Sequence, residues 1–142
     1  MAGTRTLTII KPDAFASGKA GKIISHLEDA GFQIVASRVL RLTQDQAAAF
    51  YEVHKERPFF GPLTTFMTSG ACMPIVLERD DAVSALRRTI GATDPAEAEE
   101  GTVRKLYAES KERNAIHASD SDENAEVEAA FFFSATELLQ AR

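Results

Sequence analysis

The order of strand-like and helical segments constrains the fold of this chain more than any other feature of its sequence. Some short segments are rich in β-branched residues, whereas others place apolar side chains three and four residues apart, as one face of a helix requires. The predicted strands cover residues 6–10, 32–42, 72–77 and the neighbourhood of 116–117, and the predicted helices cover 23–30, 44–51, a short segment ending near 69, 82–90 and a final segment ending near 133.

Local signals mark the ends of several of these helices. Thr43 and Gln46 form a capping-box pattern, in which each side chain binds the other residue's backbone amide, and Asp120 with Glu123 resembles a second one. Gly91 is placed to end the helix before it, because glycine adopts a left-handed conformation at a helix C-terminus without strain.

Three segments require a different interpretation. Lys11-Pro12-Asp13 indicates a turn after the first strand. Pro74 lies inside the predicted strand 72–77 but has no amide hydrogen, so we expect it at a sheet edge or a bulge. Residues 92–106 have no clear period and contain Thr93-Asp94-Pro95, so we expect a long loop, and long loops in compact domains usually serve a function.

This order of elements predicts an α+β fold. Without the helical hairpin over residues 44–69, the remaining elements follow a βαββαβ order, the ferredoxin-like arrangement of a four-stranded antiparallel sheet with helices packed on it. The chain of 142 residues suits a single domain, residues 1–142, with that inserted hairpin and one long loop. A doubly wound parallel sheet is the competing fold.

Composition argues against several classes of partner. Sixteen lysines and arginines against 21 aspartates and glutamates give a net charge of −5, which opposes general nucleic-acid binding but allows a locally basic pocket for a small anion. Cys72 is the only cysteine, so the chain has no internal disulfide and suits a reducing compartment, most simply the cytoplasm. No apolar stretch approaches the length of a membrane span.

His117 is the residue best placed for covalent chemistry. It lies within the sequence NAIHAS, among small residues that leave its ring accessible. Glu128 shares a face of the last predicted helix with Ala125 and Phe132, and a carboxylate on an apolar stripe needs a partner. If His117 is that partner, the carboxylate fixes its tautomer and leaves the other ring nitrogen free to attack. A solvated Glu128 and a hydrogen-bonded core histidine form the competing interpretation.

Several cationic side chains are candidates for binding an anion. Lys11 follows the first strand, Arg87 lies on a predicted helix and Arg104 lies in the long loop, and arginine forks suit phosphate oxygens. Phe59 is either a stacking platform for a base or a core residue. The chain has no Gly-x-x-x-x-Gly-Lys-Ser/Thr loop, and its three histidines and single cysteine show no metal-ligand spacing.

Taken together and in order, these motifs closely resemble those of the nucleoside diphosphate kinase family over nearly the whole chain. The matching segments are TLTIIKPDA (6–14), YEVH (51–54), RPFF (57–60), FMTSG (66–70), GATDP (91–95), GTVR (101–104), NAIHASDS (114–121) and FF (132–133). The resemblance implies ping-pong transfer of the γ-phosphoryl group of a nucleoside triphosphate to a nucleoside diphosphate through a phosphohistidine. It further implies broad base and sugar tolerance and a role in maintaining nucleotide pools.

The resemblance also implies roles for individual residues. His117 would attack through Nδ1, Glu128 and Ser119 would orient its ring, and Tyr51 would lie beside it. The positions matched to phosphate contacts are Lys11, Arg87, Thr93 and Arg104; those matched to sugar contacts are Asn114 and Lys11; and Phe59 matches the residue that stacks on the base. Mg²⁺ would be held mainly by the nucleotide phosphates and water, without metal ligands from the protein.

A few positions depart from the family pattern. Ala118 stands where glycine usually follows the histidine, which adds strain if that backbone needs a positive φ. Glu100 and Leu106 replace a common proline and a common aspartate. None of these departures removes a residue matched to catalysis.

The resemblance implies a homo-oligomer built from dimers, with a tetramer favoured over a hexamer and a free dimer as the alternative. An inactive nucleotide-binding relative and a ferredoxin-like DNA-binding regulator are the competing functions. The intact His117 opposes the first of these, and the net charge of −5 opposes the second.

Overall fold

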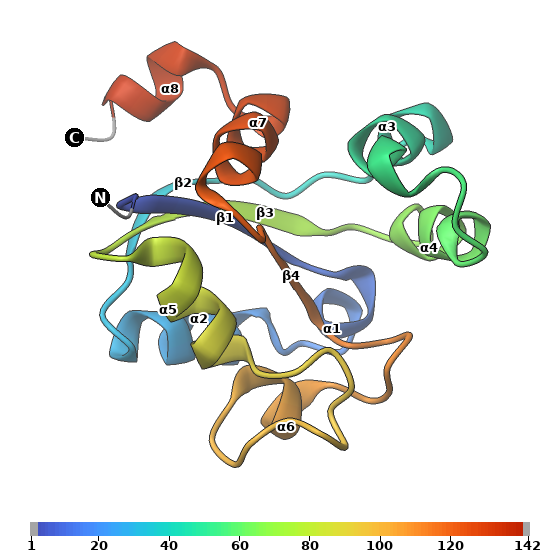
Figure 1. Cartoon of the computed structure of the whole chain (residues 1–142), viewed down its shortest axis with the longest axis horizontal. Coiled ribbons are helices and arrows are strands. Elements are labelled where there is room, and N and C mark those ends of the chain that lie inside the picture. Colours follow the sequence, from blue (N-terminus) through green and yellow to red (C-terminus); the bar gives the residue numbers. More distant parts are fainter. Residues whose placement is uncertain (1–2, 141–142) are drawn as a thin grey trace.

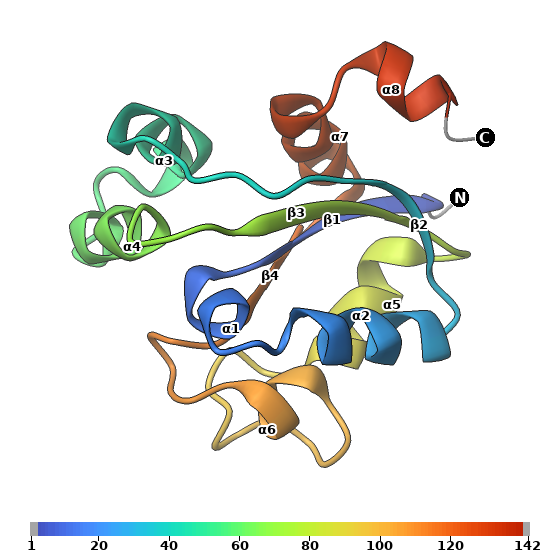
Figure 2. The same cartoon turned by 180° about the vertical axis from the view of Figure 1, so that it is seen from behind.

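The strands form one antiparallel sheet with helices on both faces (Figures 1 and 2). The computed structural model describes residues 3–140, and its strand order is β2-β3-β1-β4. The strands are β1 (Arg5–Ile10), β2 (Gln33–Ser37), β3 (Met73–Glu78) and β4 (Ile116–Ala118). Every neighbouring pair is antiparallel, so the ferredoxin-like α+β prediction is confirmed and the doubly wound parallel alternative is wrong.

Helices connect and flank these strands. They are α1 (Pro12–Ala16), α2 (Ala20–Asp29), α3 (Gln44–Phe50), the 3₁₀ helix η1 (Glu52–His54), α4 (Phe60–Met67), α5 (Ala82–Ile90), α6 (Val103–Tyr107), α7 (Asp122–Phe132) and α8 (Ala135–Gln140). Helices α3 and α4 lie against each other beyond the end of the sheet, as the predicted inserted hairpin (Figure 1). Within residues 3–140, no helix has the length and apolar character needed to cross a membrane.

The two central strands build a separate core on each face of the sheet. Leu7 and Ile9 of β1 pack with α3 and α7, whereas Ile10 packs with α2 and α5. Strand β3 likewise places Val76 in the first core and Ile75 in the second. Because side chains alternate along a strand, a strand buried on both faces needs apolar residues at successive positions. That requirement accounts for the adjacent apolar residues Ile9-Ile10 in β1 and Ile75-Val76 in β3.

Pro74 lies in the central strand β3, so the prediction of an edge or a bulge is wrong. Its neighbour on β1 is Ile9, and on the other side its carbonyl accepts a hydrogen bond from the Arg38 amide at 3.2 Å. Strand β2 ends one residue before Arg38, at Ser37, which is shorter than the predicted strand over 32–42. Pairing continues past the end of β2 in the same register, since Leu40 bridges Cys72, so Pro74 accepts one hydrogen bond from this extension and donates none.

The connections contain more helix than the sequence predicts. The expected turn at Lys11-Pro12-Asp13 begins α1, with Pro12 at the first helical position, where its missing amide hydrogen costs nothing. The expected loop over 92–106 leads into α6, which begins after Thr102. Helix α8 was not predicted.

The helix ends follow the predicted chemistry with one exception. Thr43 and Gln46 form the complete capping box of α3. Helix α7 is capped by Ser121 and not by Asp120, because the Ser121 hydroxyl accepts the hydrogen bond from the Asn124 amide at 3.1 Å. The predicted capping position is therefore wrong by one residue.

Gly91 occupies a position where the fold has no room for a side chain. Its φ is 88°, and a Cβ atom would lie 2.6 Å from the hydroxyl oxygen of Thr102. We expect Gly91→Ala to lower the free energy of unfolding by about 1–3 kcal/mol, measured by urea denaturation. Gly21→Ala in α2 is the matched control, since its Cβ would meet no atom within 4 Å, and it should leave stability unchanged or slightly raised. Equal losses in both variants would contradict this assignment.

Candidate active site

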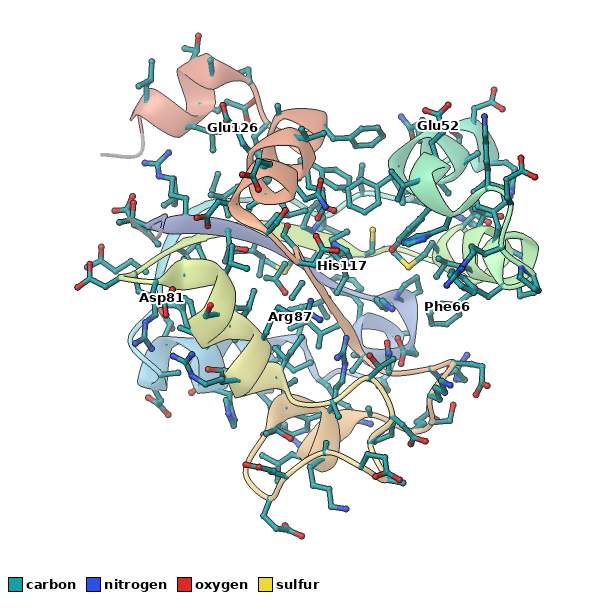
Figure 3. The ribbon with its side chains drawn as sticks, viewed as in Figure 1. Glu52, Phe66, Asp81, Arg87, His117 and Glu126 are labelled. Carbon is teal, nitrogen blue, oxygen red and sulfur yellow. The ribbon has the colours of Figure 1, made fainter. Side chains whose placement is uncertain are left out.

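His117 lies at the centre of the molecule on the short strand β4, next to β1 (Figure 3). It pairs with Ile9 of β1, and its backbone carbonyl accepts a hydrogen bond from the Thr8 hydroxyl at 2.7 Å. The side chain is 18% exposed, so a substrate can reach it from solvent. The histidine is therefore held by a sheet rather than by a loop.

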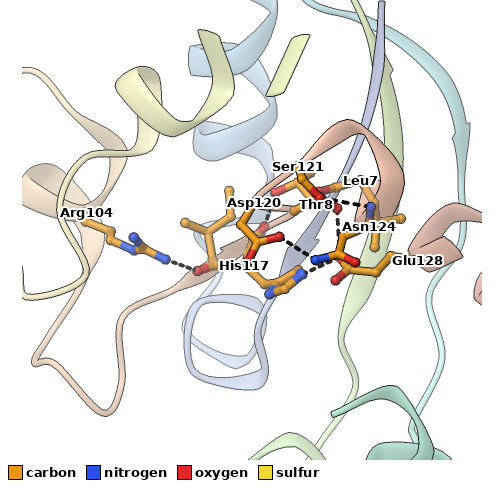
Figure 4. Close-up of polar contacts among 10 residues, drawn as sticks. Leu7, Thr8, Arg104, His117, Asp120, Ser121, Asn124 and Glu128 are labelled. Carbon is orange, nitrogen blue, oxygen red and sulfur yellow. Dashed lines mark hydrogen bonds and ion pairs between the residues drawn. The ribbon is translucent and has the colours of Figure 1, made fainter. Parts of the chain in front are cut away.

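The ring of His117 is bound by a carboxylate from α7 (Figure 4). Its Nε2 lies 2.7 Å from Oε1 of Glu128, and the Ser119 hydroxyl donates to the same oxygen at 2.7 Å. A carboxylate oxygen accepts hydrogen bonds, so the proton of the neutral ring belongs on Nε2 and the lone pair on Nδ1. The alternative of a solvated Glu128 is wrong, because that side chain is only 20% exposed and has His117 as its partner.

Two aromatic side chains from the end of α3 pack edge-on against the histidine. The ring centroid of Phe50 lies 5.4 Å from that of His117, and the centroid of Tyr51 lies 6.1 Å away. Burial and the nearby Glu128 charge raise the pKa of Tyr51 far above its ordinary value, so its hydroxyl stays protonated. Tyr51 was predicted at this site and Phe50 was not, although both share the apolar face of the predicted helix.

The strained backbone near the histidine is not where the sequence suggested. Ala118 lies in β4 and, among the described residues, the non-glycine positions with positive φ are Asp81 and Ala115. The substitution of alanine for the usual glycine at 118 therefore adds no left-handed strain. Ala115 instead has φ of 74°, between Asn114 and the strand that carries His117.

Lys11, Asn114 and Thr93 form a chain of hydrogen bonds beside this strained turn. The Lys11 ammonium donates to the Asn114 side-chain oxygen at 2.9 Å, and the Asn114 side-chain nitrogen donates to the Thr93 carbonyl at 3.2 Å. Burial, with the nearby Arg104 charge second, lowers the pKa of Lys11 to about 8. An anion bound here would favour the charged form of the lysine.

Arg104 is held with its guanidinium group next to the start of β4 (Figure 4). Its two terminal nitrogens donate to the carbonyls of Gly91 at 3.0 Å and Ile116 at 2.7 Å. Burial, followed by the charge of Arg87, lowers the pKa of Arg104 to about 10. Within residues 3–140, neither Arg87 nor Arg104 forms an ion pair, so together they leave a positive field that suits phosphate.

Two cavities bring together all six residues matched to nucleotide contacts. One of about 570 Å³ is lined by Lys11, Phe59, Thr93 and Asn114, and another of about 660 Å³ is lined by Arg87, Thr93 and Arg104. Thr93 borders both, so the cavities are neighbours.

The wall of the first cavity also contains residues that the sequence analysis missed. Pro62, Leu63 and Phe66 extend its apolar side, and the exposed Lys111 and Glu112 lie at its rim. The apolar residues follow Phe59 in α4, where helix spacing could have indicated them. No sequence signal indicated the two charged residues.

A hydrogen-bonded histidine with one unprotonated nitrogen, next to a cationic cavity with an aromatic wall, is typical of an enzyme that transfers phosphoryl groups. The fold and the site place the chain in that class. A family model for nucleoside diphosphate kinase matches residues 4–138, and the chain belongs to this family. Its members transfer phosphoryl groups between nucleotides through a phosphohistidine intermediate, and they bind nucleoside di- and triphosphates.

Individual relatives cover almost the whole chain. The nucleoside diphosphate kinase of Chlorobium chlorochromatii is 58% identical over 136 residues, which are 96% of this chain and 97% of that protein. The Aquifex aeolicus nucleoside diphosphate kinase structure has a TM-score of 0.92 at 46% identity and covers 94% of this chain and 97% of its own. A Halobacterium salinarum nucleoside diphosphate kinase in complex with CDP has a TM-score of 0.89 at 36% identity, covering 94% of this chain and 89% of its own.

The Glu128 contact predicts how the histidine ring behaves without it. In Glu128→Ala, Nε2 loses its acceptor, so ¹⁵N NMR of His117 should change from one dominant tautomer to a mixture. The rate of phosphorylation from ATP should fall roughly 10²–10⁴-fold, as expected when a reactive histidine loses the carboxylate that orients it. Glu126→Ala is the control, because Glu126 is exposed on the same helix, and it should behave as wild type. An unchanged tautomer in Glu128→Ala would contradict the assignment.

Proposed function

We propose that His117 carries the phosphoryl group in this nucleoside diphosphate kinase. The Nδ1 lone pair attacks the γ-phosphorus, the bond from that phosphorus to the bridging oxygen breaks, and the nucleoside diphosphate leaves with that oxygen. A second nucleoside diphosphate then attacks the phospho-imidazole through a terminal oxygen and restores the free ring. The observation that supports this role is the 2.7 Å contact of Nε2 with Glu128, which leaves Nδ1 unprotonated.

The cations are proposed to hold the phosphates in line with this nitrogen. Lys11, Arg87 and Arg104 face the two cavities, and Thr93 lies where the cavities adjoin. Phosphoryl transfer depends mainly on positioning and on cations around the transferred group, which these side chains supply without a glycine-rich loop. Glu128, Ser119 and Tyr51 then act on the histidine rather than on the nucleotide.

The base and the sugar are proposed to bind in the first cavity. Phe59 is 45% exposed and offers a face for stacking, which tolerates every base because each has a π-face. Asn114 and Lys11 are close enough to each other to share the sugar hydroxyls. We infer broad base and sugar tolerance from this arrangement, in keeping with a role in balancing nucleotide pools.

Mg²⁺ is the proposed metal, and the donors in the cavities fit a metal that arrives with the nucleotide. The residues matched to phosphate contacts are Lys11, Arg87, Thr93 and Arg104, which bind phosphate oxygens rather than Mg²⁺, although Glu97, Glu99 and Glu112 also line the cavities. The phosphates and water would therefore hold the ion, which neutralises charge on the transferred group when bound.

We further propose that residues 1–142 act as one domain in a homo-oligomer built from dimers, a tetramer rather than a hexamer. Edge strand β2 supports contacts between copies, because Ile34 in it and Val39 just after it are 39% and 54% exposed. The free, buried thiol of Cys72 supports location in the reducing cytoplasm. Native mass spectrometry tests the assembly, since a tetramer has four times the 15.5 kDa mass of the chain.

The phosphohistidine assignment predicts where label from γ-³²P-ATP appears. Wild-type protein with Mg²⁺ should carry acid-labile, base-stable label on His117, and added GDP should release it as GTP. His117→Ala should keep its fold, carry no label and lose transfer activity, because the proposed acceptor nitrogen is gone. His26→Ala, a substitution on the distant helix α2, should label normally. Transfer retained by His117→Ala would overturn the assignment, and ATP binding without label in wild type would indicate an inactive binding module.

Stacking on Phe59 predicts that its loss affects all bases alike. Phe59→Ala should raise KM for ADP, GDP, CDP and UDP by a similar factor, about tenfold, because base–aromatic stacking contributes about 1–3 kcal/mol. Steady-state kinetics with the four acceptors measures this. A loss confined to one base would show that Lys111 or Glu112 reads the base edge.

The pKa of Lys11 predicts a loss of activity in alkaline solution. Lys11 is charged below a pKa of about 8 and neutral above it, so phosphate binding weakens as pH rises through that value. The kcat/KM profile reports groups of the free enzyme and should fall on its alkaline side near this pH. Lys11→Arg retains its charge, so its alkaline fall should move to higher pH. An identical alkaline fall in both proteins would assign it to another group.

A further inference from the structure

One buried carboxylate takes no part in the chemistry proposed above. Asp13 is 5% exposed in the first turn of α1, and its Oδ2 accepts a hydrogen bond from the Ala115 amide at 3.0 Å. Its other oxygen, Oδ1, is buried without a hydrogen-bond partner among the described residues. Burying a half-satisfied carboxylate costs free energy, so a purely stabilising role explains it poorly.

The amide that Asp13 binds belongs to a strained residue. Ala115 is fully buried and has φ of 74°, a region that alanine occupies only when its surroundings hold it there. Across the turn itself, the Ile116 amide donates to the Asn114 carbonyl at 2.9 Å, and residues 11–13 supply the other contacts. Asp13 binds the amide of Ala115, and the backbone amide of Lys11 donates to its carbonyl at 2.9 Å.

The left-handed turn at Ala115 determines the position of Asn114 but not that of His117. Asn114 precedes the turn, and its contact with the Lys11 ammonium depends on the backbone angle at Ala115. His117 follows the turn but is fixed independently, by pairing with Ile9 and by the contact with Glu128. Release of the turn would therefore displace Asn114 from Lys11 and leave the histidine in place.

We propose that Asp13 is a positioning residue for the nucleotide sugar. Its carboxylate holds Ala115 in the left-handed conformation and so keeps Asn114 aligned with Lys11 on the sugar hydroxyls. The inference rests on the proposed sugar contacts of Asn114 and Lys11, and it adds a residue that touches neither nucleotide nor histidine.

The charge of Asp13 has a second, separable effect. Three groups act on the Lys11 ammonium from neighbouring elements: Asn114 accepts its hydrogen bond, Arg104 of α6 repels it and Asp13 of α1 attracts it. Removal of the Asp13 charge alone would therefore lower the pKa of Lys11 further, while an oxygen at the same place would still bind the Ala115 amide.

The test compares ADP with 2′,3′-dideoxy-ADP as phosphoryl acceptors. In Asp13→Ala, the kcat/KM for ADP divided by that for 2′,3′-dideoxy-ADP should fall about tenfold. Only ADP has sugar hydroxyls whose contacts can be lost. When Asp13→Ala is combined with Ala115→Gly, this acceptor ratio should rise again by about threefold or more, since glycine holds a positive φ without support. Asp45→Ala, in the exposed first turn of α3, is the matched control and should keep the wild-type ratio.

Asp13→Asn separates the hydrogen bond from the charge. The ratio of the two acceptors should stay at the wild-type value, whereas the alkaline fall of kcat/KM should move to lower pH. If Asp13→Ala fails to fold, the acceptor ratio of Asp13→Asn decides the matter, because a fall in that ratio contradicts positioning through the hydrogen bond. An unshifted alkaline fall contradicts only the effect assigned to the charge.

Two results overturn the proposal about Asp13. One is an equal loss with both acceptors in Asp13→Ala that Ala115→Gly does not rescue, and the other is a fall in the acceptor ratio in Asp13→Asn, which keeps the hydrogen bond. Labelling of His117 by γ-³²P-ATP in wild type is measured alongside. Missing label contradicts the proposed function itself, whereas normal label with an unchanged acceptor ratio in Asp13→Ala contradicts the Asp13 proposal alone.

Discussion

The pairing of β1 with β4 is the interaction on which the rest of the site depends. Strand β4 is only three residues long, so it has few hydrogen bonds of its own, and β1 fixes its position. That pairing places His117 beside Ile9, and the chain that continues from β1 supplies Lys11 and Asp13 to the opposite side of the same turn. One central strand, buried on both faces, thus aligns the histidine and the residues around the nucleotide cavity.

The cations of the site carry an electrostatic cost that the fold accepts. Lys11 and Arg104 are each 8% exposed, and burial lowers the pKa of both, with further lowering by the charge of Arg104 at Lys11 and by the charge of Arg87 at Arg104. Backbone carbonyls of Gly91 and Ile116 hold Arg104 in place, but a carbonyl does not neutralise a charge. A bound phosphate would supply the missing negative charge, so the same arrangement that costs stability in the free protein favours the substrate.

Much of the fold and the core of the site could be predicted from the sequence, and the failures have physical reasons. Glu128 was predicted as a candidate partner of His117, beside the alternative of a solvated carboxylate, because a carboxylate on an apolar stripe is a local conflict that periodicity exposes. The strain at Ala115 left no such signal, since an alanine looks ordinary and its φ depends on Asp13, 102 residues away. Pro74 was misplaced for a similar reason: a strand's neighbours, and where each of them ends, are properties of the sheet and not of the segment.

The structure also explains how this site tolerates departures from its family pattern. Glu100 and Leu106 differ from common family residues, but both are exposed and neither lies in β4 or α7, the elements that hold the histidine ring. Ring orientation depends on β4 and α7, whereas the proposed phosphate and sugar contacts depend on the turn before β4 and on the end of α5. Because these supports are different elements, a change in the loop over 92–102 can alter nucleotide affinity without altering the tautomer of His117, and the chemical step can persist while its binding surface varies.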